Sequence, residues 1–521
     1  MEHILPFAIV LTLLVTCYSL YDLHRVSVLT VNSEKLVTLS KPQNESFIPS
    51  IIEKSNHTEV SNKPVSSFPP PSTNNLGKCQ ISPNTDIWGD VVVWGSQNLK
   101  DSIEDCCNSC HDHKPLPGQM SCNVWAYCGD KDACKSEYKQ CWLKHLPHVT
   151  ATKPKGKGSH IPWTAGTTGS PMETDPIPTK HTGRKYHVVT SVQGSAVHWQ
   201  IRIHYYHYKK VKAACDKLPV CDMGGFTRLL HSGEPDDLIN EIPTVVVNPL
   251  PKSAVENNWY VVLNRPYAFV QWTQQVTIPE KYVLMSEPDH IFLHPIPNLM
   301  VGENPASFPF FYIEPSKQST TKIVERFVGT SDIAELDKIA PIGNSPTFLS
   351  FQDMARSMPL WMNISIAVFK DAEAQKEWGW VQEMYGFAFA LYRIGVYDVA
   401  LYPQLMAQPP WDTGLDMAPG KPFQILHYTY GMDYKLTGEF TPGVVGQWRF
   451  DKRTYSSRPP RRDFPHRPPD RMDNDLVRRL MKSFEEAMLA IPCWNEYAAT
   501  GAAVFDCEEA KTKPLLKDIT F

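Results

Sequence analysis

A short apolar run that ends in two carboxylates and an imidazole is the part of the sequence best suited to chemistry. Residues 282–290 read Tyr-Val-Leu-Met-Ser-Glu-Pro-Asp-His, a run short enough for one buried strand that Pro288 would stop. In open α/β sheets, ligands bind beyond the carboxyl ends of the strands. Glu287, Asp289 and His290 are therefore oxygen and nitrogen donors of the kind that hold a divalent cation against a diphosphate. The alternative is an ordinary solvated turn, because acidic turns are common.

Further segments downstream and upstream carry polar residues next to glycines or aromatic residues. Two glycines before Arg228 could let the backbone approach a phosphate or could form a turn. Glu383 is a carboxylate among aromatic residues in a helical stretch, where a surface glutamate beside a core stripe is the alternative. His427 lies on an apolar strand, as a late metal ligand or as a packed core histidine. The segments are Cys221–Arg228, Trp378–Tyr385, Gln408–Asp412 and Gln424–Gly431.

The length and composition indicate more than one ordinary domain. With 521 residues, 42% of them hydrophobic, and 14 Trp, the chain can bury a large core, and we expect two folded units. The formal net charge of -4 is mild for this length, so nothing in the overall composition indicates a nucleic-acid partner.

The N-terminus carries an apolar stretch from Ile4 to Tyr21 that is just long enough to span a bilayer. A cleaved signal peptide would usually show a basic segment before this stretch and an A-x-A-like site after it, and neither is present. Residues 1–25 are therefore predicted to be an uncleaved signal anchor.

Residues 26–77 are polar and rich in Pro and Ser, which is typical of a solvated stem. The chain has three Asn-x-Ser/Thr glycosylation sequons, and two of them, Asn44 and Asn56, lie in this stem, whereas the third is Asn363. Two sequons behind a membrane anchor favour a protein of the secretory pathway.

Cysteine is concentrated in one short region. Eight of the 13 Cys lie between residues 79 and 141, and an even, dense set predicts a disulfide framework. Zinc is the alternative, since Cys107 and Cys110 have the spacing of metal ligands, but no second C-x-x-C or H-x-x-x-H follows them.

The end of this Cys-rich region, Asn123–Lys144, resembles the ending of PAN/apple modules. In those modules a core strand that carries a Cys is followed by a closing Cys-x-Leu-Lys, as in Cys141–Lys144. PAN/apple modules bind proteins or glycans. The resemblance implies a small recognition domain at residues 78–146, with a simple spacer as the alternative.

Residues 147–184 are of low complexity and are predicted to be a linker. From residue 185 to 455, strands alternate with helical segments, which predicts an α/β layer fold with a largely parallel sheet. The predicted strands are Tyr186–Val192, Phe226–His231, Thr244–Val247 and the run ending at Ser286, and the predicted helices are Trp199–Val211 and Arg265–Gln275.

The last part of the chain, residues 456–521, begins with a basic, Pro-rich stretch. An amphipathic helix over Asp475–Ala490 follows, and we expect it to pack on the domain before it. Two further Cys pairs could each close a short loop, namely Cys215 with Cys221 and Cys493 with Cys507.

A series of segments resembles, in order, the plant and algal hydroxyproline O-arabinosyltransferases. They span about residues 186–455, slightly over half of the chain. The matching segments are Met223–Arg228, Leu263–Trp272, Leu284–His290, Phe308–Pro315, Pro341–Pro346, Trp361–Asn363, Gly379–Gly386, Gln408–Asp412, His427–Gly431 and Trp448–Arg453. The Cys-rich region and the long stem are not part of the short land-plant members of that family.

This resemblance implies a Golgi type II membrane enzyme with a lumenal, GT-A-like catalytic domain. It implies transfer of L-arabinofuranose from UDP-β-L-arabinofuranose to the hydroxyl of 4-hydroxyproline in secreted peptides and cell-wall glycoproteins. Glu287-Pro-Asp289 then looks like a variant of the D-x-D motif. Asp289 would bridge Mn²⁺ to the diphosphate, Glu287 would touch the ribose or the metal, and His427 would complete the metal shell.

The UDP leaving group develops negative charge that a cation and nearby arginines can stabilise. Arg228, Arg265 and Arg449 are the candidates for that support. The family's β-donor and β-product imply retention, which requires no dedicated base, so Glu383 and Asp412 are expected to position the acceptor or the sugar. With inversion, one of them would be the general base, and Glu383 is the better candidate because aromatic surroundings could raise its pKa.

The expected acceptor is a hydroxyproline-rich chain, which adopts an extended polyproline II helix and docks on aromatic grooves. The candidate acceptor-binding residues are Trp378, Trp380, Tyr385 and Trp411. The alternative for each is a place in the core, because large aromatic residues are usually buried.

Two other functions remain open at this stage. The peptidyl-serine galactosyltransferases share the general architecture, and sugar choice depends on pocket shape rather than on residue identity alone. A membrane-anchored glycan- or peptide-binding protein with an inactive transferase domain would be expected to have lost its metal ligands.

Overall fold

The computed structural model describes the chain from residue 79 onward, with short gaps. The described residues are 79–87, 89–115, 120–146, 154–157, 161–168, 177–255, 260–464 and 467–521. The predicted signal anchor and stem, with Asn44 and Asn56, lie outside them. Within the described ranges, no helix has both the length and the apolar character needed to cross a membrane.

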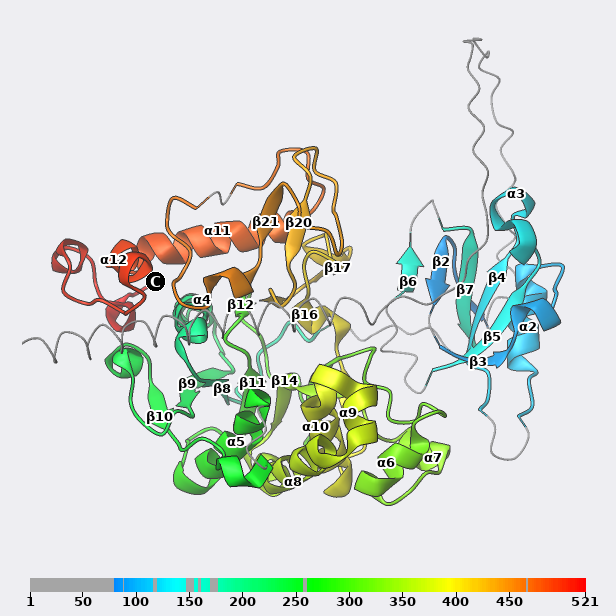
Figure 1. Ribbon diagram of the computed structural model, residues 1–521, viewed down its shortest axis with the longest axis horizontal. Coiled ribbons are helices and arrows are strands. Elements are labelled where there is room, and N and C mark those ends of the chain that lie inside the picture. Colours follow the sequence, from blue (N-terminus) through cyan, green and yellow to red (C-terminus); the bar gives the residue numbers. More distant parts are fainter. Residues whose placement is uncertain are drawn as a thin grey trace, which may run out of the picture. The chain divides into compact units, whose positions relative to one another are not determined.

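The Cys-rich region folds around a five-stranded antiparallel sheet in the order β1-β7-β4-β5-β3 (Figure 1). The central strand β4 is buried along its whole length, and helix α2 presents its Cys residues to it. The strands are β1 (Cys79–Ser82), β3 (Asp90–Val93), β4 (Val124–Cys128), β5 (Cys141–His145) and β7 (Trp163–Thr168), and the helices are α2 (Ile103–His111) and α3 (Lys131–Cys134). A two-stranded sheet joins β2 (Thr85–Ile87) and β6 (Pro154–Lys157).

All eight Cys of this region form disulfides, which confirms the predicted framework. The two residues with zinc-like spacing, Cys107 and Cys110, belong to different disulfides. The pairs are Cys79–Cys107, Cys106–Cys141, Cys110–Cys122 and Cys128–Cys134. A domain this small buries little apolar surface, so cross-links supply much of its stability.

The predicted boundary of this domain at residue 146 is too early. Strand β7 lies in the segment predicted as a linker, 147–184, yet it pairs with β4 and with β1 in the middle of the sheet. The segment carries no run of large apolar residues, and its strand is recognisable only by its partners. The disulfide-rich domain therefore extends to Thr168, and its likeness to PAN/apple modules remains a prediction.

The second folded unit is built on a seven-stranded sheet in the order β10-β9-β8-β11-β14-β13-β15 (Figure 1). Strand β14 runs antiparallel to both of its neighbours, and the other four pairings are parallel, which confirms the predicted α/β fold with a mostly parallel sheet. The strands are β8 (Tyr186–Val192), β9 (Met223–Leu230), β10 (Thr244–Val246), β11 (Tyr282–Ser286), β13 (Ala306–Pro309), β14 (Ile342–Ser350) and β15 (Ala400–Leu401).

Helices cover both faces of this sheet, which explains why β8, β11 and β14 are buried along their whole length. Helices α5, α8 and α10 lie on one side and α4 on the other (Figure 1). The helices are α4 (His198–Asp216), α5 (Asn264–Gln275), α6 (Thr321–Val328), α7 (Ile333–Leu336), α8 (Phe351–Lys370), α9 (Ala372–Trp378) and α10 (Gln382–Arg393). The predicted strands and helices of this unit are all present: β8 and β11 have the predicted bounds, and the ends of the others are shifted by up to five residues.

The C-terminal helix α11 (Asp475–Ala490) has the predicted bounds and packs on the second unit as expected. Its buried stripe belongs to the main core, and Phe484 meets Trp199 of α4 at 5.9 Å between ring centroids. Helix α12 (Trp494–Thr500) follows, and Cys493–Cys507 form the predicted loop disulfide. Smaller sheets join β12 (His290–Phe292), β16 (Met406–Ala407) and β19 (Ile425–His427), β17 (Asp416–Ala418) and β18 (Lys421–Pro422), and β20 (Met432–Tyr434) and β21 (Trp448–Phe450).

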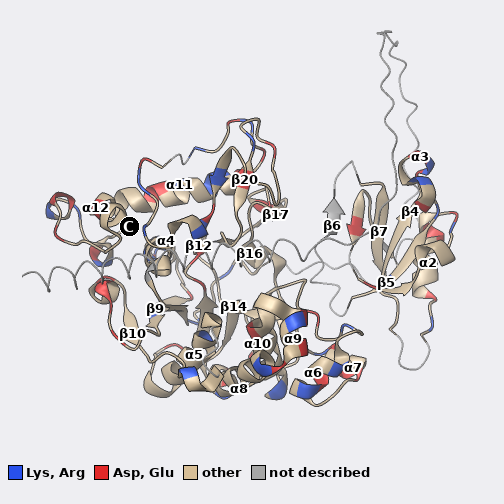
Figure 2. Cartoon of the chain, in the orientation of Figure 1, with Lys and Arg blue, Asp and Glu red and all other residues tan. Residues whose placement is uncertain are grey.

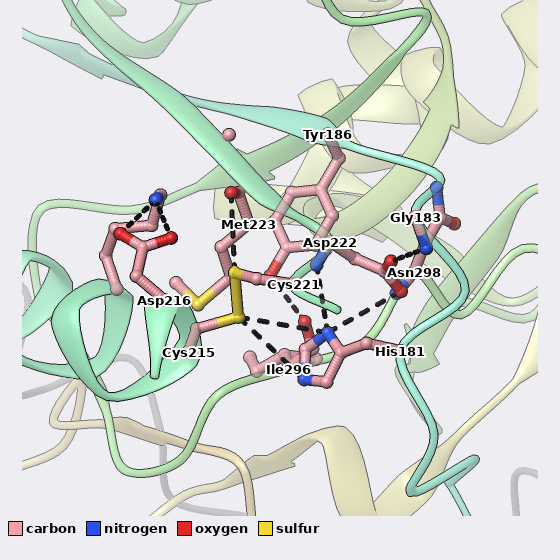
Figure 3. Close-up of a disulfide and its surroundings, with 12 residues drawn as sticks. His181, Gly183, Tyr186, Cys215, Asp216, Cys221, Asp222, Met223, Ile296 and Asn298 are labelled. Atoms are coloured by element: carbon pink, nitrogen blue, oxygen red, sulfur yellow. Dashed lines mark hydrogen bonds and ion pairs between the residues drawn. A yellow bond between two sulfur atoms is a disulfide. The ribbon is translucent and has the colours of Figure 1, made fainter. Parts of the chain in front are cut away.

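The predicted disulfide Cys215–Cys221 joins the end of α4 to the start of β9 (Figure 3). Next to it, the fully buried carboxylate of Asp222 accepts backbone N–H groups from Gly183 at 2.6 Å and from Asn298 at 2.9 Å. These bonds tie the segment that enters β8 to the segment after β12. A disulfide and hydrogen bonds therefore stabilise the amino end of the sheet. The carboxyl ends of the strands lie at the opposite edge.

Lys and Arg residues are interspersed with Asp and Glu along the helices of the second unit (Figure 2). Many of them form local pairs such as Lys322–Glu325 and Lys338–Glu335. Exposed pairs of this kind contribute little to stability, and they leave the surface with mixed charge.

Candidate active site

The predicted site lies at the carboxyl end of β11, where the chain leaves the sheet. Strand β12 begins only four residues after Ser286 and pairs antiparallel with β19, and the register places His290 directly opposite His427. The two imidazole rings are 4.7 Å apart between centroids. Strand pairing therefore joins two histidines that are far apart in the sequence, beside Asp289.

Asp289 is the centre of this cluster. Its side chain is buried, and Oδ2 lies 3.1 Å from Nε2 of His427 and contacts the ammonium of Lys452. Burial alone would raise the pKa of Asp289, but the charges of Lys452 and His427 outweigh burial and hold the pKa well below its ordinary value. The carboxylate is therefore ionised at neutral pH.

Asp289 and His427 fit a divalent cation, whereas His290 fits less well. His290 Nδ1 accepts the backbone N–H of Glu287 at 3.3 Å, so the neutral ring carries its proton on Nε2, and a protonated nitrogen cannot bind a metal. His427 presents Nε2 to Asp289, and its buried Nδ1 has no hydrogen-bond partner among the described residues. One carboxylate and one imidazole suit a cation that completes its shell with phosphate oxygens.

Glu287 is not a member of the cation cluster, contrary to its predicted role as a metal ligand. Its carboxylate accepts a hydrogen bond from Arg265 at 2.8 Å, and the same guanidinium reaches Glu383 at 3.5 Å and Asn344 Oδ1 at 3.3 Å. The positive charge of the Arg265 guanidinium neutralises the Glu287 carboxylate, which therefore needs no metal ion as a partner. Glu287 still lines the cavity at this edge of the sheet, so a contact with the donor ribose remains a prediction.

Glu383 lies on the first turn of α10, with only 2% of its surface exposed. Burial raises its pKa to about 7, although Arg265 opposes the shift. The direction agrees with the prediction. Helix α10 reaches this position because Gly379 has φ of +49°, which ends α9 and turns the chain, and because Gly386 lets α10 approach Ser365 of α8 closely.

These side chains open into one cavity of about 400 Å³ at the carboxyl edge of the sheet. Its polar lining includes Asp289 and His427, and also Arg265 with the two carboxylates that it contacts, Glu287 and Glu383. The residues that line it are Ser191, Val192, Gln193, Val197, Gln200, His231, Val261, Val262, Arg265, Glu287, Pro288, Asp289, Phe310, Tyr312, Asn344, Ser345, Trp380, Val381, Glu383, Met384, His427, Thr429 and Lys452. Its size suits a nucleotide sugar.

A second cavity of about 450 Å³ adjoins the first. The two share Tyr312, Trp380, Val381, His427 and Thr429. The rest of its lining is aromatic or polar, and consists of Glu314, Lys317, Glu377, Trp378, Tyr385, Gln408 and Tyr430. A larger cavity of about 580 Å³, lined mainly by residues between Thr454 and Phe464, includes none of the residues at the carboxyl ends of the strands.

The four predicted acceptor-binding aromatic residues differ in burial and in whether they line a cavity. Trp378 and Tyr385 stack on each other at 4.3 Å and are 5% and 4% exposed, so they are mainly core residues, although both also line the second cavity. Trp380 is 65% exposed and lines both cavities. Trp411 is 60% exposed but is not among the residues that line the two cavities, and it packs edge-on against Phe440.

Two of the three predicted arginines are committed to structural ion pairs instead of the cavity. Arg228 is fully buried and binds the Asp236 carboxylate with two hydrogen bonds of 2.6 and 2.7 Å. Arg449 pairs with Asp433 at 3.0 Å and with Asp451 at 2.8 Å. Of the three, Arg265 alone lines the cavity.

Asp412, predicted to act with Glu383, stabilises a turn. Its Oδ2 accepts the backbone N–H of Gln408 at 2.7 Å, and its carbonyl accepts from Asn474 at 3.3 Å. Aspartate side chains commonly hold turns together in this way. Asn363, the predicted third glycosylation site, is exposed on α8.

Sequence reasoning did not single out Lys452, Asn344 or Tyr312. Lys452 lies in the segment Trp448–Arg453, one of the segments that resemble the arabinosyltransferases, so the resemblance was the one available signal. Its contact with Asp289 joins positions 163 residues apart, which no local pattern encodes.

A cation cluster and a basic side chain at the carboxyl edge of an α/β sheet, beside a cavity of this size, define a candidate nucleotide-sugar site. The chain matches the hydroxyproline O-arabinosyltransferase family, with the N-terminal domain of that family at residues 186–401 and the C-terminal domain at 424–495.

Its curated relatives agree. Hydroxyproline O-arabinosyltransferase RDN2 of Medicago truncatula is 46% identical over 320 residues, which cover 61% of this chain and 84% of the relative. Hydroxyproline O-arabinosyltransferase 3 of Arabidopsis thaliana is 47% identical over 311 residues, covering 60% and 82%. The chain therefore belongs to the hydroxyproline O-arabinosyltransferase family. A peptidyl serine alpha-galactosyltransferase of Arabidopsis thaliana is 23% identical over 224 residues, covering 41% of this chain and 25% of the relative.

Among solved structures, the galactosyltransferase LgtC in complex with donor and acceptor sugar analogs is similar with a TM-score of 0.27 and 12% identity, covering 47% of this chain and 87% of that one. Mouse xyloside xylosyltransferase 1 is similar with a TM-score of 0.26 and 11% identity, covering 47% and 97%. The strand order of the central sheet and its single antiparallel strand, in a chain of this family, agree with the predicted GT-A-like fold.

Proposed function

We propose that the protein transfers L-arabinofuranose from UDP-β-L-arabinofuranose to the hydroxyl of 4-hydroxyproline in secreted peptides or glycoproteins. The observation that carries the proposal is the cluster of Asp289, His427 and Lys452, which opens into a nucleotide-sized cavity in a chain of this family. An inactive relative would not be expected to keep this cluster together.

Asp289 and His427 are the residues that would hold a divalent cation, and we propose Mn²⁺. When bound, the cation would supply positive charge to the diphosphate as the bond to the sugar breaks. Lys452 and Arg265 line the same cavity and supply further positive charge. Arg265 is kept in place by Glu287, so its guanidinium needs no rearrangement when the donor binds.

The second cavity supports a place for the acceptor. Because it shares Trp380 and Tyr312 with the first cavity, a chain that lies in it would reach the donor site. Polyproline II chains dock well on exposed aromatic rings, and the exposed Trp380 and the half-buried Tyr430 offer rings there. We propose that the hydroxyproline ring meets the sugar at the junction of the two cavities.

Glu383 is the carboxylate best placed to act on the acceptor or the sugar. With a pKa of about 7 it can either accept a proton or donate a hydrogen bond near neutral pH. If the reaction proceeds with retention, the acceptor proton passes to the departing phosphate and Glu383 positions the reactants. If it inverts, Glu383 is the general base.

We also propose that the protein resides in the Golgi membrane as a single-pass type II protein with a lumenal catalytic domain. Six disulfides, which use 12 of the 13 Cys, support passage through an oxidising compartment. Co-localisation of the tagged full chain with a Golgi marker, and protection of its C-terminus from protease in intact vesicles, would test this. A protease-accessible C-terminus contradicts the orientation.

A transfer assay tests the function. The protein is offered UDP-arabinofuranose or UDP-galactose, with a hydroxyproline peptide or a serine peptide, with and without Mn²⁺. We expect arabinose on hydroxyproline only, and loss of transfer in Asp289→Ala. Galactose on serine would assign the chain the activity named in its more distant relative, and no transfer in any combination contradicts the proposal.

A further inference from the structure

Lys452 and His427 share one oxygen of Asp289. Lys452 begins the short 3-10 helix Lys452–Tyr455 after β21, and its ammonium contacts Asp289 Oδ2 from the cavity side. His427 Nε2 lies 3.1 Å from the same oxygen. Because Asp289 is only 3% exposed, its charge needs a cationic partner, and Lys452 provides one.

The Lys452 contact and a bound divalent cation are in competition. Oδ2 is the Asp289 oxygen that faces Nε2 of His427, so a cation held by these two residues would lie at Oδ2, and the ammonium of Lys452 already contacts that oxygen. An ammonium and a dication on one carboxylate oxygen would repel each other strongly in this buried position. Lys452 must therefore leave Asp289 when a cation binds, and it then needs another anion.

The remaining charges of the cavity show where that anion must come from. Arg265 is already paired with Glu287, and Glu383, with its pKa of about 7, carries only part of a negative charge at neutral pH. Among the residues that line the cavity, Asp289, Glu287 and Glu383 are the only acidic side chains. A cation that bound alone would leave the ammonium of Lys452 without a partner. A diphosphate brings the missing negative charge.

We propose that Lys452 and a divalent cation alternate on Asp289, and that Lys452 turns to the diphosphate of the donor when the cation takes its place. The inference rests on the proposed function only in requiring a nucleoside diphosphate as ligand. It makes Lys452 a source of coupling between the two ligands beyond the direct contact of cation and phosphate: the cation binds weakly alone, and each ligand strengthens the binding of the other by the same factor.

The experiment measures equilibrium binding rather than transfer. Free Mn²⁺ is followed by electron paramagnetic resonance in a titration of the protein, with and without saturating UDP, and the Mn²⁺ that UDP itself binds is subtracted with a protein-free titration. In the wild type we expect UDP to tighten Mn²⁺ binding about tenfold or more. In Lys452→Met, we expect Mn²⁺ alone to bind several-fold more tightly than in the wild type, and the effect of UDP to fall by the same several-fold factor, to the part that phosphate ligation of the cation supplies. Lys452→Arg keeps the charge and is expected to retain most of the coupling.

Lys435→Met is the matched control. Lys435 is an exposed lysine that pairs with Glu439, and its replacement removes the same charge away from the cavity. We expect wild-type coupling in this variant. Thermal unfolding of each variant shows whether it is folded, and a Lys452→Met protein that does not fold leaves Lys452→Arg and the wild-type titration to test the coupling.

Three results would overturn the inference. The first is Mn²⁺ that binds Lys452→Met no more tightly than the wild type in the absence of UDP. The second is an undiminished effect of UDP in that variant, and the third is a wild-type protein in which UDP leaves Mn²⁺ affinity unchanged. Because the assay uses only Mn²⁺ and UDP, a failure to transfer arabinose would leave these outcomes readable, and so the two proposals fail independently.

Discussion

Replacing Glu383 by a glutamine should stabilise the protein relative to the wild type increasingly as the pH rises. In the folded protein the pKa of Glu383 is raised from 4.5 to about 7, because burial penalises the charged form. A group with a raised acidic pKa favours folding while it is protonated, and that contribution is lost as the pH rises from the unfolded value toward the folded one. At 1.36 kcal/mol for each pKa unit, the full loss is about 3 kcal/mol.

A glutamine side chain at this position cannot ionise, so the Glu383→Gln protein escapes this loss. The variant also loses the attraction between Glu383 and Arg265. This attraction lowers the pKa of Glu383, so it is already included in the value of about 7. We therefore expect the difference in unfolding free energy between variant and wild type to grow by about 2–3 kcal/mol from pH 5 to pH 8. The Tm difference should change by several degrees.

Thermal unfolding at five or six pH values, with the disulfides intact, measures this difference. Glu485→Gln, on an exposed side chain of α11, is the control and should follow the wild type at every pH. Parallel curves for Glu383→Gln and the wild type would refute the reasoning, since they would mean that Glu383 titrates alike in the folded and unfolded chains. Activity is a separate readout: a general base predicts a loss of at least about 100-fold, and a positioning role predicts a smaller one.

Three other predictions follow from the placement of single side chains. Asp289→Asn should lower kcat/KM for transfer by about 100-fold or more and abolish the dependence on Mn²⁺, measured at saturating acceptor; retained metal dependence would contradict the site. Trp380→Ala should raise the KM for a hydroxyproline peptide about tenfold, whereas Trp411→Ala, which removes a similarly exposed ring outside both cavities, should leave it unchanged; equal effects would remove the second cavity as the acceptor site. Arg228→Met should destabilise the fold by about 3 kcal/mol, because it leaves Asp236 without its buried partner, and should leave the KM for the UDP-sugar unaltered; a raised donor KM in a stably folded variant would return Arg228 to the site.

Local patterns were sufficient to predict the main elements of the fold. Hydrophobic runs bounded by turn residues predicted β8, β9, β10 and β11, and helical periodicity predicted α11 to the residue. The density of Cys predicted the disulfide framework, because it depends on composition and compartment rather than on contacts. Strand β7 was missed, since it is a short strand of mostly small and polar residues whose identity comes from its partners β4 and β1.

The sequence by itself determined where the candidate site lies, and the tertiary structure decided which residues belong to it. Asp289 follows a buried strand, and this strand-end position is visible in the sequence, as is the chemistry of a nearby carboxylate and imidazole. Whether Glu287 binds a cation or an arginine, however, depends on which side chain approaches it from α5. The same holds for Arg228 and Arg449, which pair with other carboxylates, and for Asp412, which accepts a backbone N–H in a turn.

Lys452 is the clearest case of a residue that only the folded chain could identify. It contacts an oxygen of Asp289, 163 residues earlier in the sequence, because it lies just after strand β21. A sequence specifies residue types and their local spacing, and from these the chemistry that is available. Long-range contacts decide which of the available groups meet, because burial and the neighbouring charge set the protonation and partners of each one.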